Sequence, residues 1–256
     1  MLLKLKFYIF SIFLIVSNIV MAQEYLPPRP YGGKKQLKEF ILSELEFPEK
    51  ALNDKVNDKV IINFFIDSKG KASLYKIKKS VSPEVDKEAL RILKKILWKP
   101  AIFMGKPISH DHSIEIKFNY KQYRKICKRR GYNKIIYPFK PVDTTNKIYS
   151  FKKVEFIPTP VFKNKNQSIN EFIAKKIEYP PAAKQQGLTG TVKISFIVET
   201  SGRISNIVIL NHLGAGCDEE AVRVLKLIKW MPGIDKGKAV RVKMVLDVTF
   251  NLYNKF

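Results

Sequence analysis

The chain has 256 residues, of which 45% are hydrophobic, so it is long enough for one or two domains with buried cores. Its 47 basic and 23 acidic residues give a net charge of +24, a balance that often indicates a nucleic-acid partner. An N-terminal export signal argues against DNA and RNA as partners. The two cysteines, Cys127 and Cys217, are too few for a disulfide framework, and the sequence leaves open whether they pair or stay free.

The first 22 residues have the pattern of a secretory signal peptide. Lys4 and Lys6 supply positive charge, a mainly apolar run over residues 7–19 follows, and Ala22 ends a stretch that fits a cleavage site. The apolar stretch to Ala22 has 16 residues. That is shorter than the roughly 20 residues needed to cross a bilayer. We therefore expect the signal to be cleaved and the mature protein to be soluble in the cell envelope.

The remainder of the chain is a duplication. At an offset of 132 residues, residues 40–118 align with residues 172–250 without a gap. Self-similarity at a fixed spacing indicates repeated structural units. We predict module one over residues 23–120, a basic linker over residues 121–153 and module two over residues 154–256. Matching pairs include Phe40 and Phe172, Pro48 and Pro180, Phe64 and Phe196, Gly70 and Gly202, Asp86 and Asp218, Trp98 and Trp230, and Phe118 and Phe250.

Each copy is predicted to run helix, strand, strand, helix, strand. In copy two, helical spacing over residues 169–177 precedes an alternating strand over 192–198, a turn, and a return strand over 204–209. A second helix begins at residue 217 and is expected to end at Trp230 and Pro232, with the tryptophan plugging the core. The last strand is apolar at every second position from Val240 to Leu252. Each copy should therefore be a two-layer α+β module, a three-stranded antiparallel sheet with two helices on one face.

Much of the positive charge lies between the two copies. Residues 121–167 contain 13 basic and 2 acidic residues, a net charge of 13 − 2 = +11. The mature chain, without Lys4 and Lys6, carries 24 − 2 = +22. Apolar residues in this region show no sustained period, so we expect the linker to be more mobile than the modules. It is interpreted as a solvated connection, with attraction to an anionic surface or an acidic partner as the functional alternative.

Copy two resembles the C-terminal domain of the TonB family. Copy one resembles a diverged sibling that retains Phe47-Pro48 and Trp98-x-Pro100. The motifs of copy two are Tyr179-Pro180-x-x-Ala183, Gly190-x-Val192-x-Ile194-x-Phe196, Ser201-Gly202-Arg203-Ile204, Gly216-Cys217-Asp218-Glu219-Glu220-Ala221, Trp230-x-Pro232-Gly233 and Gly237-Lys238-x-Val240.

The resemblance implies a periplasmic domain that binds the TonB box, a short extended peptide of an outer-membrane active transporter. In the family the box adds a strand beside the last strand of the sheet, near the aromatic-Pro segment, and an inner-membrane complex supplies energy. The open edge of a three-stranded sheet can accept such a strand. The family's membrane anchor and proline-rich spacer have no counterpart here, so binding is the stronger expectation. The implied partner-binding residues are Tyr179, Pro180, Val240, Arg241, Val242, Lys243, Met244 and Val245.

No catalytic, cofactor or metal site is expected. His110 and His112 could supply two metal ligands, but His212 is the one other histidine, so two partly exposed histidines are the simpler interpretation. No Ser/His/Asp or Cys/His set recurs at a fixed place in both copies. The alternative to transporter binding is an envelope protein whose basic surface holds anionic lipid or polysaccharide.

Cleavage is expected directly after Ala22, because small residues at that junction suit a signal peptidase. Intact-mass analysis of the exported protein should give a chain that begins at Gln23. Retention of residues 1–22 would contradict this expectation and would favour an anchored protein that transmits force.

Overall fold

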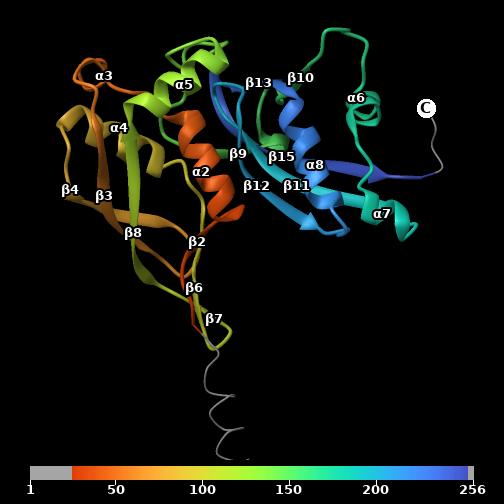
Figure 1. Cartoon of the computed structure of the whole chain (residues 1–256), viewed down its shortest axis with the longest axis horizontal. Helices are drawn as coiled ribbons and strands as arrows, with labels where there is room; N and C mark the ends of the chain where they lie inside the picture. Colours follow the sequence, from red (N-terminus) through yellow and green to blue (C-terminus); the bar gives the residue numbers. More distant parts are fainter. Residues whose placement is uncertain (1–24, 253–256) are drawn as a thin grey trace, which may run out of the picture.

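The computed structural model describes residues 25–252. Residues 1–24, which include the predicted signal peptide, and residues 253–256 lie outside the described part. Two modules lie side by side, and helix α2 (Gly33–Glu44) of module one stands between them (Figure 1). Within residues 25–252 no helix combines the length and the apolar character that a membrane crossing requires.

Module one contains short paired strands at its start and one extra helix at its end. Its elements are β1 (Tyr25–Leu26), β2 (Arg29–Pro30), α2, α3 (Glu49–Asn53), β3 (Asn57–Ile66), β4 (Ala72–Lys79), α4 (Pro83–Leu93), β5 (Trp98–Lys99), β6 (Ala101–Phe103), β7 (Lys106–Ile108), β8 (His110–Asn119) and α5 (Tyr120–Arg130).

Module two repeats this order and replaces β7 and β8 by one long strand. Its elements, with the segment before it, are β9 (Ile148–Ser150), the 3-10 turn η1 (Phe151–Lys153), β10 (Thr159–Val161), α6 (Ile169–Lys176), α7 (Pro181–Gln185), β11 (Gly190–Val198), β12 (Ile204–Asn211), α8 (Cys217–Leu227), β13 (Lys229–Met231), β14 (Gly233–Asp235) and β15 (Lys238–Phe250).

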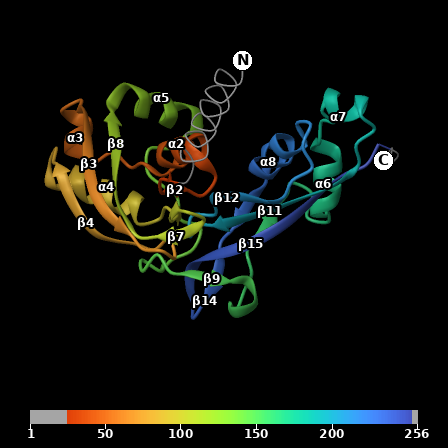
Figure 2. The same cartoon turned by 90° about the horizontal axis from the view of Figure 1, so that it is seen from below.

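The two central sheets have the same topology. Their strand orders are β4-β3-β8 and β12-β11-β15, and all these neighbours are antiparallel. The register between β11 and β15 is unbroken from Gly190 opposite Phe250 to Val198 opposite Val242. Helices cover one face of each sheet, and the alternating apolar residues of the strands form the core (Figure 2). The predicted pair of two-layer α+β modules is confirmed.

Each tryptophan fills part of the core of its module, but neither lies at the end of a helix. Trp98 and Trp230 are buried, and they lie on the short strands β5 and β13 because α4 and α8 end earlier, at Leu93 and Leu227. The expectation that these helices continue to the tryptophan and the following proline was therefore wrong. The hairpin turn fits against the tryptophan backbone: a Cβ added to Gly202 would lie 2.2 Å from the carbonyl oxygen of Trp230.

The segment expected to be an irregular, mobile linker contains regular structure. Helix α5 packs Tyr123 and Cys127 into the core of module one, and β9 pairs with β15 of module two. Arg130 ties this segment to module one: its guanidinium donates to the carbonyl oxygens of Tyr132 (2.8 Å) and Asn133 (2.7 Å) within the segment and of Ser43 (3.3 Å) in module one. The absence of an apolar period was misleading because two apolar contacts suffice to dock a helix of three turns.

A buried network of charges joins the two modules. Lys95 of module one lies 2.9 Å from Glu44 and 3.3 Å from Glu199 of module two. Arg241 donates two hydrogen bonds of 2.9 Å to Glu199 and a third, also 2.9 Å, to the carbonyl oxygen of Lys95. Arg203 pairs with Glu44 at 3.3 Å. Glu199 is fully buried and Arg241 is 2% exposed, so the network is shielded from water.

Burial alone would raise the pKa of Glu199. The positive charges of Arg241 and Lys95, together with hydrogen bonds from Arg241 and Ser205, outweigh burial and hold this pKa below its ordinary value. Burial would likewise lower the pKa of Lys95, and the charges of Glu199 and Glu44 raise it instead. The two modules therefore meet through fully ionised groups that satisfy one another.

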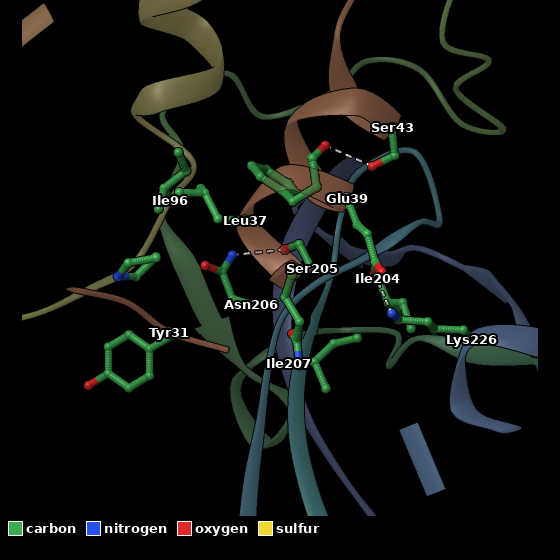
Figure 3. A pocket seen from close by; sticks show the side chains of 13 residues that line it. Tyr31, Leu37, Glu39, Ser43, Ile96, Ile204, Ser205, Asn206, Ile207 and Lys226 are labelled. Carbon is green, nitrogen blue, oxygen red and sulfur yellow. Dashed lines mark hydrogen bonds and ion pairs between the residues drawn. The ribbon is translucent and has the colours of Figure 1, made fainter. Parts of the chain in front are cut away.

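Figure 3 shows the seam beside this network. Asn206 and Ile207 of β12 face Leu37 of α2 across a cavity of about 210 Å³, and an ion pair between Glu39 and Lys226 closes one side. The Asn206 side chain accepts from the backbone N–H of Leu97 (2.9 Å) and donates to the carbonyl oxygen of Lys95 (3.2 Å). The seam is thus held by hydrogen bonds as well as by charge.

The substitution Glu199→Gln should lower the free energy of unfolding by about 3–5 kcal/mol, because Arg241 would stay buried without its anion and Lys95 would keep Glu44 alone. Variants that keep one tryptophan, Trp98 or Trp230, report on one module each in urea unfolding. The two reporters should give the same urea midpoint when Glu199 is present and different urea midpoints in Glu199→Gln. The contribution of Glu199 should be present above about pH 4.5 and fade as the pH falls through its lower folded-state pKa.

The control is Asp67→Asn, at the equivalent position of module one, where the carboxylate is exposed and bonds its own turn. It should shift neither reporter appreciably. Separate midpoints in the protein that retains Glu199 would contradict the docked arrangement.

Candidate functional site

The outer edge of β12 is covered by module one. The Asn206 side chain bonds Leu97 and Lys95 of module one. Gly32 also lies against this edge, because a Cβ added to it would be 2.7 Å from the carbonyl oxygen of Ile207. A strand has no room to add here while the modules are docked. Module one therefore covers this edge of the module-two sheet at Asn206 and Ile207.

The outer edge of β15 is covered over its first residues by the segment between the modules. Strand β9 pairs with it in parallel, with Ile148 opposite Arg241 and Ser150 opposite Lys243. A few residues earlier, the N–H of Ala239 donates to the carbonyl oxygen of Pro141 (3.0 Å) and its carbonyl accepts from Asp143 (2.8 Å). Residues 141–150 thus cover the edge from Ala239 to Lys243 (Figure 2).

These contacts define which amides of β15 point outward. Both backbone groups of Ala239 face the covering segment, and direction alternates along a regular strand. The N–H groups of Arg241, Lys243 and Val245 therefore point to the outer edge, and that of Leu246 points to β11. Beyond Lys243, within residues 25–252, no strand pairs with this outer edge. The open stretch runs from Met244 to Phe250.

A groove of about 250 Å³ borders the open stretch. It lies between α6 and the end of β15. The Tyr179 ring stands at right angles to that of Phe250, with centroids 5.6 Å apart, and its hydroxyl donates to the carbonyl oxygen of Leu188. The groove has an apolar floor and a polar rim, and its lining residues are Asn170, Ile173, Ala174, Ile177, Tyr179, Asp247, Thr249, Phe250 and Asn251.

The structure brings some of the predicted binding residues to this stretch. Tyr179 lines the groove, Val245 is 44% exposed, Lys243 is exposed, and Met244 is half-buried against the core. Pro180 lies beside α7, where it begins that helix and packs near Gly216.

The other predicted residues lie inside the protein. Val240 and Val242 are buried in module two, and the Arg241 side chain belongs to the charge network between the modules. The assignment of Arg241 as a partner-binding side chain does not agree with this burial. Side-chain alternation could not reveal it, because another module and the linker cover the face that the pattern predicts to be wet.

The sequence interpretation also missed part of the groove. Ile173 and Ile177 fall within the helical spacing predicted over residues 169–177, and Asp247 and Thr249 lie between the apolar positions of the last strand, yet all four line the groove. The signal that could have found them is the length of the alternating strand, which continues well past Val245.

In module one the corresponding region is covered by α5. The Tyr123 ring lies 5.0 Å from that of Phe47, which occupies the position of Tyr179, and Phe47 also contacts Phe118 at 5.5 Å. Burial, as the largest cause, raises the pKa of Tyr123 to about 12. Leu45 and Phe47 are buried, whereas the equivalent Ile177 and Tyr179 are half-exposed. The two copies thus differ in whether this groove is filled.

The histidines of module one have structural surroundings. The His112 ring packs edge-on against Phe64 and Trp98, with centroids 5.5 and 5.1 Å apart. Burial, and then the charge of His110, lowers the pKa of His112. Among the residues that the structure describes, no group of three or more His, Cys, Asp or Glu side chains could hold a metal ion. Both cysteines are free and buried, and each lies in the core of a different module.

Comparison with known proteins agrees with the duplication. No curated protein matches the chain. A model of the family described as Gram-negative bacterial TonB protein C-terminal matches twice, over residues 43–120 and residues 175–252. The two matches begin and end 132 residues apart, which is the offset of the internal repeat. The first match ends at the first residue of α5, and β9 lies outside both. Together the matches cover more than half of the sequence, and the chain therefore belongs to the TonB C-terminal family, whose domain it contains in two tandem copies.

Proposed function

We propose that module two binds an extended TonB-box segment of an outer-membrane transporter by adding it as a strand along the open stretch of β15. Family membership already associates the chain with TonB-dependent transport. The observation that carries the proposal is the unpaired outer edge of β15 beyond Lys243, directly beside the groove at Tyr179. Backbone groups there can pair with any extended peptide, and the groove can select side chains.

The β12 edge and the groove of module one are both covered, which favours a single binding place. Module one closes the β12 edge, and α5 fills the groove of module one. The β4 edge carries Lys76, Lys78 and Lys79, which is how exposed edges are commonly protected from pairing. Among the β4, β12 and β15 edges in the part of the chain that the structure describes, the end of β15 alone combines an unpaired edge with an open groove.

The proposal covers binding and not the transmission of force. Transmission would require attachment to the inner-membrane energising complex, whereas the first 22 residues fit a cleaved signal. A protein of this kind would hold a transporter segment in the periplasm, in the manner of an adaptor.

A second candidate function rests on the exposed face of α5. Five basic residues of this helix are exposed, and the helix contains no acidic residue. Such a face favours contact with anionic lipid or polysaccharide of the envelope. Salt separates the two functions, because charge-driven binding weakens steeply with ionic strength and backbone pairing does not. The five residues are Lys121, Arg124, Lys125, Lys128 and Arg129.

Val245→Pro tests the proposed function, since it removes an outward N–H in the open stretch while edge strands tolerate proline. Isothermal titration with a synthetic TonB-box peptide should give a micromolar dissociation constant for the unmodified chain, on the order expected for one added strand. The variant should bind at least about tenfold more weakly, with an unchanged circular dichroism spectrum.

Two matched substitutions serve as controls. Ser113→Pro, at the equivalent position of module one, should leave peptide binding unchanged. Leu246→Pro should unfold module two, because its N–H faces β11. If Val245→Pro folds and binds the peptide as tightly as the unmodified chain, the end of β15 is not the recognition edge.

A further inference from the structure

The segment between the modules occupies the part of the outer β15 edge that directly precedes the open stretch assigned to a partner by the proposed function. Residues 141–150 lie along β15 from Ala239 to Lys243, and they do so as an extended peptide would, through backbone hydrogen bonds and a parallel three-residue ladder. The family matches end at residue 120 and resume at residue 175, so this occupant is not part of the repeated domain.

Side-chain contacts give the segment a defined shape without burying it. The Asn146 carbonyl accepts from Arg241 (2.9 Å), the Tyr149 hydroxyl bonds Asp143 (3.4 Å), and the Lys147 ammonium lies 4.6 Å from the Tyr149 ring centroid. No residue from 141 to 150 is buried. Hydrophobic burial therefore contributes little to holding the segment, and such elements open more easily than core strands.

The covalent connection compensates for the weak contact. A segment tethered at both ends experiences an effective concentration in the millimolar range, far above that of a free partner. It therefore occupies the edge in the absence of a competitor, and it can yield to a peptide that pairs along more of β15.

We propose that residues 141–150 are an internal competitor, which a partner strand displaces in order to pair along β15 from Ala239 onward. This inference rests on the proposed function. The segment regulates the same site, because a long partner strand can pair only while the edge is uncovered. The apparent affinity for that strand is therefore reduced in proportion to the fraction of time for which the segment covers the edge. Arg241 links the cover to the rest of the protein, because one guanidinium holds Asn146, Glu199 and the Lys95 carbonyl.

The register identifies the residue to change. Ala239 bonds the two residues that flank its partner Val142, and the same pattern places the bonds of Arg241 on Lys147 and Tyr149, which flank Ile148. Tyr149→Pro therefore removes an N–H that faces β15. Ile148→Pro removes an N–H that faces away and is the matched control.

The test is titration of the full chain with a TonB-box peptide of about eleven residues, long enough to pair from Ala239 to Thr249. Tyr149→Pro should bind about five- to tenfold more tightly than the unmodified chain, and Ile148→Pro should bind within about twofold of it. Brief trypsin treatment checks whether the segment is released, because cleavage after Lys147 should be faster in Tyr149→Pro than in the unmodified chain. A second variant, with residues 147–150 replaced by Gly-Ser-Gly-Ser, should bind like Tyr149→Pro.

The outcomes separate this inference from the function on which it rests. Equal affinity of the unmodified chain and both released variants would overturn the internal competitor and leave transporter binding intact. Weaker binding by both released variants would also overturn it, since the segment would then help to form the site. Absence of binding in all variants would overturn the proposed function, and the competitor with it.

Discussion

The arrangement depends on the buried contact among Glu44, Lys95, Glu199 and Arg241. Each charge in this contact has an opposite charge within about 3.3 Å, and Arg241 also bonds a backbone carbonyl on each side of the seam. Buried ion pairs of this kind contribute little net stability compared with apolar packing, but breaking one is costly. Their effect here is on geometry, because they fix module one against β12 and thereby close one sheet edge of module two.

The charges at this contact are not repeated at the equivalent positions of the other copy. Within the chain, β12 of module two docks near α2 of module one, and Arg203 meets Glu44 there. In the equivalent contact between two molecules, β4 of one would dock against α6 of the other. Lys71 would then stand in place of Arg203, and Lys176 in place of Glu44. Like charges at that point would oppose the contact. Duplication therefore supplied two similar surfaces whose charges differ at this point.

The periodic parts of the fold were accessible from the sequence. Alternation over residues 192–198 and from Val240 onward predicted two strands that pair in an unbroken register, and Gly202 was correctly placed in a hairpin turn. These features depend on local conformation and on one buried face, so the order of residue types encodes them.

The two segments that cover the modules, α5 and β9, could not be predicted from the sequence in the same way. Helix α5 docks through Tyr123 and Cys127, and β9 is three residues long, so neither produces a sustained pattern. The burial of Arg241 follows from a contact between distant parts of the chain. The family resemblance assigned Tyr179 to partner binding, and this residue lies beside the groove, whereas the groove itself required the packing of α6 on β15.

A partner strand is expected to add at the end of β15, and amide hydrogen exchange with and without a TonB-box peptide tests this most directly. Exchange should slow at the outward amides of Val245, Asp247 and Thr249, and should stay unchanged at Ser113, Glu115 and Lys117 on β8 of module one. Slower exchange confined to β8 or β4, or no change on β15 at a saturating peptide concentration, would contradict it.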